Sequence, residues 1–222
     1  MSRYNFFYWI NKGLRTLLYD TGFLLQRTDF TVAEEAMAAH DRLQVVLSSF
    51  EALRFKEAQY ILPAITYYEP GIADRFNQER TEVYRLHTAL EELLKNDDVS
   101  HSHPKQTANG LGVVAAFEEL SLLMILQMNS AEKLLPKILW RYYSDSELQT
   151  IAWKMAANND AICFYKWIIR GLSAGEVIRW LNEVQAIANE AELKAMHMAI
   201  TSELQFSTQG LWQQVPEEGI MA

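Results

Sequence analysis

Three side chains that could take part in chemistry lie close together in the stretch QERTEVYRLHTALEELL, from Gln78 to Leu94. They are Arg80, Tyr84 and His87. The apolar residues of this stretch recur at helical spacing and predict a helix with one apolar side, formed by Val83, Leu86, Leu90 and Leu93. Arg80 and Tyr84 are four residues apart, so they share a face of this helix beside its apolar side. Helical bundles hold metal ligands on such faces, which makes this one a candidate metal site.

Polar side chains also interrupt the apolar stripes of three other predicted helices. Asn11, Glu57 and Gln127 each stand where the pattern asks for an apolar residue. The apolar residues in register with them are Phe7, Ile10, Leu14, Leu17 and Leu18, then Leu43, Val46, Phe50 and Leu53, then Phe117, Leu120, Met124, Ala131, Leu134 and Ile138. A carboxylate within a buried stripe needs a partner, so Glu57 is the strongest of these candidates.

The elements that position these residues are long helices. The first is predicted from Tyr4 to Gln26. The second is predicted to begin at Thr31, whose spacing to Glu34 is that of a capping box, and to continue past Ile61.

A third helix is predicted after the turn residues Glu69 to Gly71, running to about Lys95. The polar stretch NDDVSHSHPKQTANG, residues 96–110, is expected to be the longest loop. A fourth long helix follows, and Pro136 is predicted to kink it.

This order predicts an all-α protein. Four long helices with three connections indicate an up-down-up-down bundle over residues 1–142. Shorter helices are expected over 143–206 as an extension packed on the bundle, because caps and breaks recur there. Residues 207–222 are expected to be a weakly ordered tail. The tryptophans that could fasten the extension to the bundle are Trp153, Trp167 and Trp180.

The composition excludes several classes of function. The chain has 222 residues and a formal net charge of −8, so it lacks the cationic excess that a nucleic-acid partner requires. Its single cysteine, Cys163, allows no intrachain disulfide and no thiolate-rich metal site, which favours the cytoplasm. Polar residues interrupt the apolar N-terminus and no uncharged apolar run of about 18 residues stands out. We therefore expect neither export nor a membrane-spanning segment.

Seven stretches, taken in order, carry a resemblance to a known family: INKGLRTLL, TDF with AEEA, FEALRFKEAQYILPAI, YEP, ERTEVYRL, QMNSAEKLLPKILWRYYSDSEL and WIIRGLSAGEVIRWL. The chain resembles bacterial hemerythrin-like (HHE-domain) proteins with a C-terminal helical extension. The resemblance runs from Arg3 to near Leu204. It implies a four-helix bundle whose relatives hold two irons, bridged by carboxylates and capped by histidines, for oxygen binding, iron handling or sensing.

The resemblance also implies where the metal ligands would stand. Two carboxylates are kept, as Glu57 and Glu132. The positions at which the family pattern has histidines are occupied by Asn11, Leu53, Arg80, Tyr84 and Gln127. Amides are weak ligands, leucine is none, and an arginine repels a cation. We therefore expect a degenerate site without a metal cofactor, with iron or another divalent ion as the alternative.

Carboxylates left in a core without metal are costly unless they protonate or meet a cation. Arg80 is a candidate cation, since its planar fork can meet both Glu57 and Glu132. The side chains expected to complete this polar network are Tyr84, Asn11 and Gln127. In the alternative, Arg80 and Tyr84 lie roughly 60° and roughly 100° from Val83 around the helix and extend to solvent.

Histidines offer a second route to metal binding. His87 could join Glu57 or Glu132 as a substitute ligand for one ion, the alternative being a half-buried histidine with a hydrogen bond. His101 and His103 alternate in the predicted loop, where they either bind a stray ion or are simply solvated.

The leading hypothesis is a cytoplasmic protein without enzymatic activity that acts as a binding, sensory or structural module. The second is a remodelled metal site with oxygen, peroxide or iron chemistry. The third is a small-molecule pocket in the vacated bundle centre, for an apolar or anionic ligand with Arg80 as its partner. The macromolecular partner is unknown, although the aromatic N-terminal helix could bury Phe6, Tyr8 and Trp9 against a second subunit.

Overall fold

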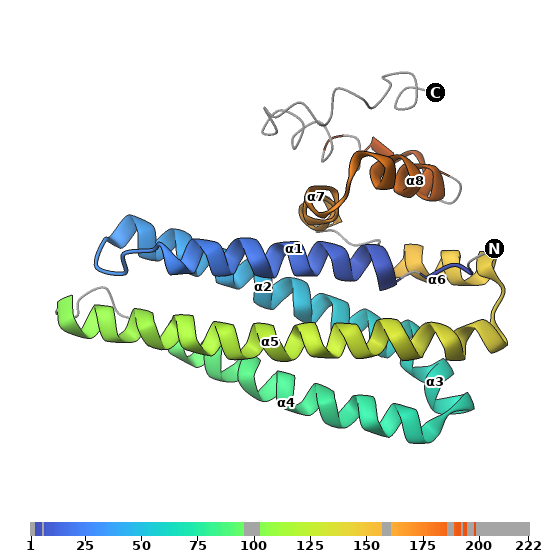
Figure 1. Cartoon of the computed structure of the whole chain (residues 1–222), viewed down its shortest axis with the longest axis horizontal. Coiled ribbons are helices and arrows are strands. Elements are labelled where there is room, and N and C mark those ends of the chain that lie inside the picture. Colours follow the sequence, from blue (N-terminus) through green and yellow to red (C-terminus); the bar gives the residue numbers. More distant parts are fainter. Residues whose placement is uncertain are drawn as a thin grey trace. The chain divides into compact units, whose positions relative to one another are not determined.

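The computed structural model of the chain describes residues 3–5, 7–95, 103–156, 161–185, 189–191, 193, 194 and 198. These residues form eight helices, and no strand occurs among them (Figure 1). The helices are α1 (Phe7–Gln26), α2 (Ala33–Tyr60), α3 (Leu62–Tyr68), α4 (Pro70–Lys95), α5 (His103–Tyr142), α6 (Asp145–Ala156), α7 (Ala161–Gly171) and α8 (Ala174–Gln185). The predicted all-α class is confirmed.

The helices belong to two compact units. One unit is Leu17–Leu135, which holds the second part of α1, then α2, α3, α4 and most of α5. The other is Met1–Thr16 together with Pro136–Ala222, which holds the start of α1, the end of α5 and α6 to α8. The predicted ranges 1–142 and 143–206 stay a prediction, and the predicted tail 207–222 lies outside the described residues.

Most of the predicted core stripes are buried. In α1 all five predicted apolar residues are at most 4% exposed, and in α4 Val83, Leu86 and Leu90 are at most 6% exposed. The prediction for Leu93 is wrong, because Leu93 is 40% exposed while Leu94 is 7% exposed. The stripe of α4 steps by four residues after Leu90 rather than by three, as a period of 3.6 allows.

The start of α2 differs from the prediction. Val32 occupies its N-cap and makes no capping hydrogen bond through its side chain. The backbone N and Oγ1 of Thr31 donate to Asp29 Oδ1 at 2.9 and 2.6 Å, and the backbone N of Asp29 donates to Glu35 Oε2 at 2.8 Å. The expected capping box of Thr31 and Glu34 is therefore wrong, because a turn centred on Asp29 leads into the helix.

The predicted second helix is also interrupted. Ile61, with φ −107° and ψ −51°, is the C-cap of α2 and the N-cap of α3. Pro63 follows within the first turn of α3 and has no N–H to donate to a carbonyl four residues earlier. The expected continuation past Ile61 thus becomes a new short helix.

The fourth long helix begins earlier than expected. α5 starts at His103, so the second half of the predicted loop, residues 103–110, is helical, and residues 96–102 lie outside the described part. Pro104, its second residue, is tolerated there because N–H groups of a first turn have no helical acceptor.

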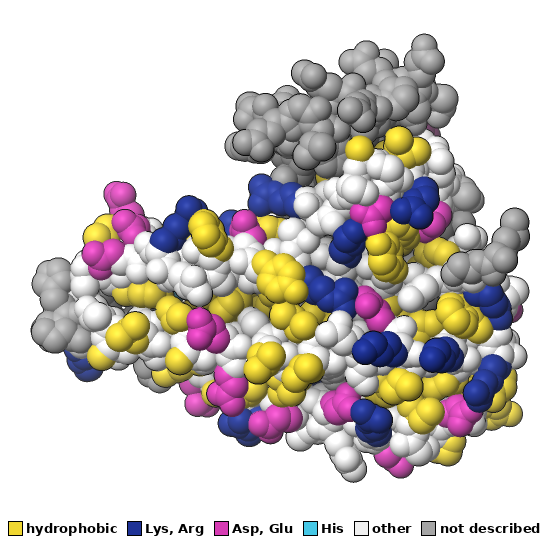
Figure 2. Space-filling view, in the orientation of Figure 1, with side chains coloured by type: hydrophobic (Ala, Val, Ile, Leu, Met, Phe, Trp, Pro, Cys, Tyr) yellow, Lys and Arg dark blue, Asp and Glu magenta, His cyan; other side chains and the backbone are white. Residues whose placement is uncertain are grey.

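α5 is long and apolar enough to cross a membrane by length and composition alone, contrary to the expectation from the sequence. One side of this helix is buried, and its exposed side carries both apolar and charged residues. Phe117, Leu120 and Met124 are at most 2% exposed, while Glu118 and Glu119 are exposed midway along the helix. Figure 2 shows hydrophobic side chains at the surface on one face of the molecule, interspersed with acidic and basic ones.

In the unit Leu17–Leu135, α2 and α4 are antiparallel. His87 Nε2 lies 3.4 Å from the carbonyl O of Leu47, and Arg80 Nη2 lies 2.8 Å from the carbonyl O of Arg54. Residue numbers therefore rise along one helix as they fall along the other.

α1 and α5 are antiparallel by the same reasoning. A Cβ atom at Gly22 would lie 3.5 Å from Phe117, and one at Gly110 would lie 2.3 Å from Cγ of Phe30, just after α1. Gly110 is thus the place where α5 approaches this turn most closely, and only a residue without a side chain fits there.

In the other unit, α7 and α8 share an apolar core with the start of α1. Trp9, Tyr165 and Trp180 are at most 8% exposed in this cluster, and the Tyr165 and Trp180 rings meet edge to face at 5.6 Å. The expectation that Trp9 could pack against a second subunit is therefore wrong, because Trp9 is buried within its own chain. Phe6 lies outside the described residues, and Tyr8 is 40% exposed.

The carboxylate of Glu176, in the first turn of α8, links α8 to α1. It accepts hydrogen bonds from the backbone N and Oγ of Ser173, both at 2.8 Å, from Lys12 Nζ at 2.6 and 2.7 Å, and from the Tyr8 hydroxyl. Burial works to raise the pKa of Glu176, but the hydrogen bonds from Lys12, Tyr8 and Ser173 outweigh it and hold that pKa far below its usual value. The charged carboxylate therefore joins the two helices through hydrogen bonds and an ion pair.

Candidate functional site

Arg80 is the residue from which the candidate site is built. It lies within the buried side of α4, between Phe76 and Val83, and is only 9% exposed. Its side chain therefore does not extend to solvent. A guanidinium that cannot be neutralised at ordinary pH must find acceptors inside the protein.

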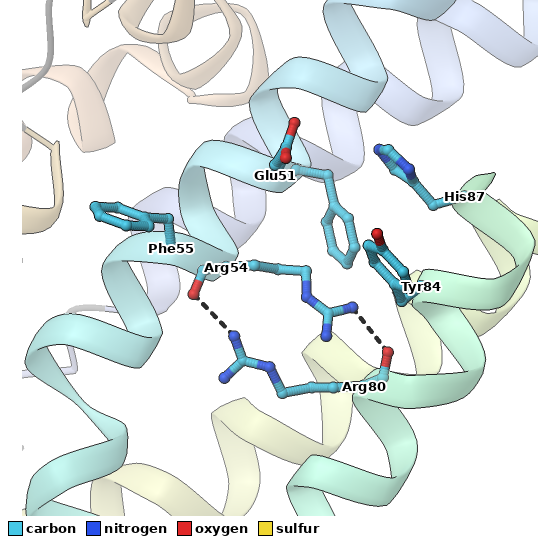
Figure 3. A pocket seen from close by; sticks show the side chains of 7 residues that line it. Glu51, Arg54, Phe55, Arg80, Tyr84 and His87 are labelled. Atoms are coloured by element: carbon cyan, nitrogen blue, oxygen red, sulfur yellow. Dashed lines mark hydrogen bonds between the residues drawn. The ribbon is translucent and has the colours of Figure 1, made fainter. Parts of the chain in front are cut away.

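One of those acceptors, the backbone O of Arg54, lies on α2. Arg80 Nη2 donates to the backbone O of Arg54 at 2.8 Å, and Arg54 Nη1 donates to the backbone O of Arg80 at 2.9 Å, so the two side chains cross in opposite directions (Figure 3). The guanidinium carbon of Arg54 also lies 5.5 Å from the centre of the Phe50 ring, in reach of a cation–π contact. Arg54 was not among the predicted residues. Its position four residues after Phe50, beside the stripe that holds Glu57, is the only signal that the sequence offers.

Glu57 supplies the negative charge. Its Oε2 lies 3.9 Å from Arg80 Nη1, and the two side chains are 22% and 11% exposed. Burial raises the pKa of the Glu57 carboxyl, while the charges of Arg80 and Arg54 act in the opposite direction. Burial also lowers the pKa of Arg54, and the neighbouring charge of Arg80 adds to this effect. The site is thus a set of two cations and one carboxylate that are buried or half-buried.

Tyr84 and His87 lie one and two turns further along α4. Tyr84 is 63% exposed, and its ring is parallel to that of His87 with 6.3 Å between centres. His87 is 6% exposed, and its Nδ1 has no hydrogen-bond partner among the described residues. Tyr84 therefore borders the site from the solvent side. We expected its hydroxyl to complete the polar network, but no hydrogen bond from Tyr84 to Arg80 or Glu57 is found among the described residues.

The remaining predicted positions are spread over both units. Leu53, Gln127 and Glu132 are half-buried. None of the contacts described for Arg80 or Glu57 involves Glu132, which has an interaction of its own. Asn11 is 2% exposed and belongs to the other unit, where its Nδ2 has no described hydrogen-bond partner. Of the expected network, only Arg80 and Glu57 are brought together.

The residues present do not fit a di-iron centre. A cation, Arg80, lies beside the carboxylate Glu57, and Tyr84 is turned to solvent. Among the residues that the structure describes, no group of three or more His, Cys, Asp and Glu side chains is placed to hold an ion. His87 is not joined with Glu57 in such a group, while His101 and the side chain of His103 lie outside the described part.

A pocket of about 270 Å³ opens beside the arginine pair (Figure 3). Its lining comes from α2 and α4 alone and consists of Phe50, Glu51, Arg54, Phe55, Arg80, Tyr84 and His87. Two of the aromatic side chains at this pocket, Phe55 and Tyr84, are 70% and 63% exposed. The arrangement can hold a small molecule with an acidic group, and it offers no nucleophile paired with a base.

Comparison of the chain with family models, with curated proteins and with solved structures finds no match in any of the three.

Proposed function

We propose that this chain is a hemerythrin-like helical protein whose metal site has been replaced by an arginine–carboxylate pair, and that it acts without turnover as a binding, sensory or structural module. The observation that carries the proposal is the position of Arg80. It stands where the family pattern has a histidine, and its guanidinium is buried 3.9 Å from the retained carboxylate Glu57. A fixed positive charge there takes over the neutralising role of a metal ion.

The directions of the helices support the bundle part of this proposal. α2 runs antiparallel to α4, and α1 runs antiparallel to α5. The ion pair of Arg42 with Asp20 joins α1 and α2, which are consecutive in the chain. An up-down-up-down bundle requires such pairings, and they therefore support this part of the proposal.

We further propose a cytoplasmic location without a membrane-spanning segment. The exposed pair Glu118 and Glu119 midway along α5 supports this, because charges facing lipid at the centre of a helix are costly. The single cysteine is consistent with a reducing compartment.

The test is the metal content of the full-length protein purified from iron-supplemented cells, measured by elemental analysis beside a Glu57→Ala variant. The proposal predicts substoichiometric iron, zinc and manganese that do not depend on Glu57. One ion or more per chain, lost on Glu57→Ala, would favour the remodelled metal site instead. Oxygen or peroxide turnover that follows this metal would contradict the absence of enzymatic activity.

A further inference from the structure

We propose that the pocket between α2 and α4 binds a small monocarboxylate with a flat apolar body, whose carboxylate is held by Arg54 and Arg80. This inference rests on the proposed function, because it requires Arg80 to stand beside Glu57 with no metal ion between them. The chemical class of the ligand follows from the size, the charge and the lining of the pocket.

The size limits the ligand. Pockets for drug-sized ligands span about 300–1,000 Å³, and this one, at about 270 Å³, lies at the small end. It has room for one ring with a short acid chain. Both helices that form it lie within one compact unit, so the pocket is a built part of that unit.

The charge favours an anion. The described hydrogen bonds use one N–H of Arg80 and one of Arg54, although each guanidinium has five such donors. Glu57 lies 3.9 Å from Arg80, beyond the distance of a hydrogen bond. Two neighbouring cations repel each other, and a carboxylate between them would relieve this repulsion while matching the planar fork of each.

The acidic residues around the arginines favour a single negative charge. Glu51 lines the pocket, and Glu57 Oε2 lies 3.9 Å from Arg80 Nη1. A dianion such as phosphate would be repelled by both carboxylates. Two arginines already face two carboxylates here, so a monoanion adds the smallest negative charge that can still bind both guanidinium groups.

The lining favours a flat apolar body. Phe50, Phe55 and Tyr84 present aromatic surface to the pocket, and the rings of Phe55 and Tyr84 are mostly exposed. A ring placed between them would cover this surface and could stack on it. Phe50 is buried, at 5% exposure, and its ring lies against the Arg54 guanidinium.

The test is calorimetric titration of the full-length, metal-free protein with phenylacetate and with its uncharged analogue phenylacetamide. We expect saturable binding of phenylacetate and at least about tenfold weaker binding of phenylacetamide, since hydrogen bonds to a charged group are the stronger ones. Inorganic phosphate should bind more weakly than phenylacetate.

Variants locate the site. Arg54→Met should weaken phenylacetate binding by about tenfold or more, and Tyr84→Ala should weaken it as well. Arg85→Met is the matched control, because Arg85 lies on α4, is not among the residues that line the pocket, and pairs with exposed Glu82 at 2.7 Å. It should leave the affinity unchanged. Arg54 is preferred to Arg80 for this test because removing Arg80 would also leave the half-buried Glu57 carboxylate without its cation.

Three results would overturn the inference: no saturable heat with phenylacetate, equal affinity for phenylacetamide, or binding that Arg54→Met leaves unaltered. If any of these results is obtained with protein shown to be free of metal, the proposed ligand is wrong while the proposed function still holds. Stoichiometric metal that depends on Glu57 removes the proposed function itself.

Discussion

Arg54 on α2 and Arg80 on α4 each donate a hydrogen bond to the backbone carbonyl of the other, at 2.9 and 2.8 Å. Carbonyl oxygens within a helix have a second lone pair, so both can accept these bonds without giving up their helical partners. The exchange joins the two helices and holds two like charges side by side. Glu57, at 3.9 Å from Arg80, partly balances them.

Gly110 and Gly112 allow a matched test of the packing between α5 and the turn after α1. A Cβ at Gly110 would lie 2.3 Å from Cγ of Phe30, whereas one at Gly112 would meet nothing within 4 Å. Gly110→Ala should lower the free energy of unfolding by about 1–3 kcal/mol through overpacking. Gly112→Ala should raise it by up to about 1 kcal/mol, as alanine is the better helix former. Urea denaturation measures both, and an equal effect of the two substitutions would contradict the close approach.

Glu176 and Glu147 offer a second matched pair. Both carboxylates accept hydrogen bonds from the backbone N and Oγ of a serine three residues earlier, Ser173 and Ser144. Only Glu176 also binds Lys12, with side chains 11% and 29% exposed. We expect Glu176→Gln to lower the free energy of unfolding by about 1.5–3 kcal/mol, the value for hydrogen bonds to a charged group. Glu147→Gln should cost clearly less, and thermal or denaturant unfolding compares them.

The effect of Glu176 should depend on pH in a definite direction. Its pKa is held far below the usual value in the folded protein, so its contribution to stability is present above about pH 4.5 and is lost as the pH falls. The difference in stability between the unmodified protein and Glu176→Gln should therefore shrink between about pH 5 and pH 3. If the difference in stability between the two proteins stays constant over this range, the ion pair of Glu176 with Lys12 is contradicted.

Local sequence patterns predicted the helices and most of their buried faces. A stripe such as Val83, Leu86 and Leu90 reports directly which side of a helix avoids water, and these residues are at most 6% exposed. The same patterns placed Glu57 at the interior. Ends of helices were less certain, because Asp29 rather than Thr31 organises the start of α2, and both are good turn residues.

The candidate site was predictable only in part. Arg80 and Tyr84 lie on the same flank of the stripe, roughly 60° and roughly 100° from Val83, yet one is 9% and the other 63% exposed. How far around α4 the contact with α2 extends depends on tertiary packing, which no local pattern contains. The pairing of Arg80 with Arg54, and of Lys12 with Glu176, joins residues 26 and 164 positions apart. Such pairs leave no periodic trace in the sequence.

The most direct test of the central claim, that a guanidinium balances Glu57 in the place of a metal, is a double-mutant cycle of Arg80→Met and Glu57→Gln. The free energy of unfolding is measured at neutral pH for the unmodified protein, both single variants and the double variant, with Arg85→Met and Glu57→Gln as the control cycle. A coupling energy of about 1 kcal/mol or more between Arg80 and Glu57, and additive effects in the control, is the predicted result. A coupling below about 0.3 kcal/mol, no larger than that of the control, would contradict the account.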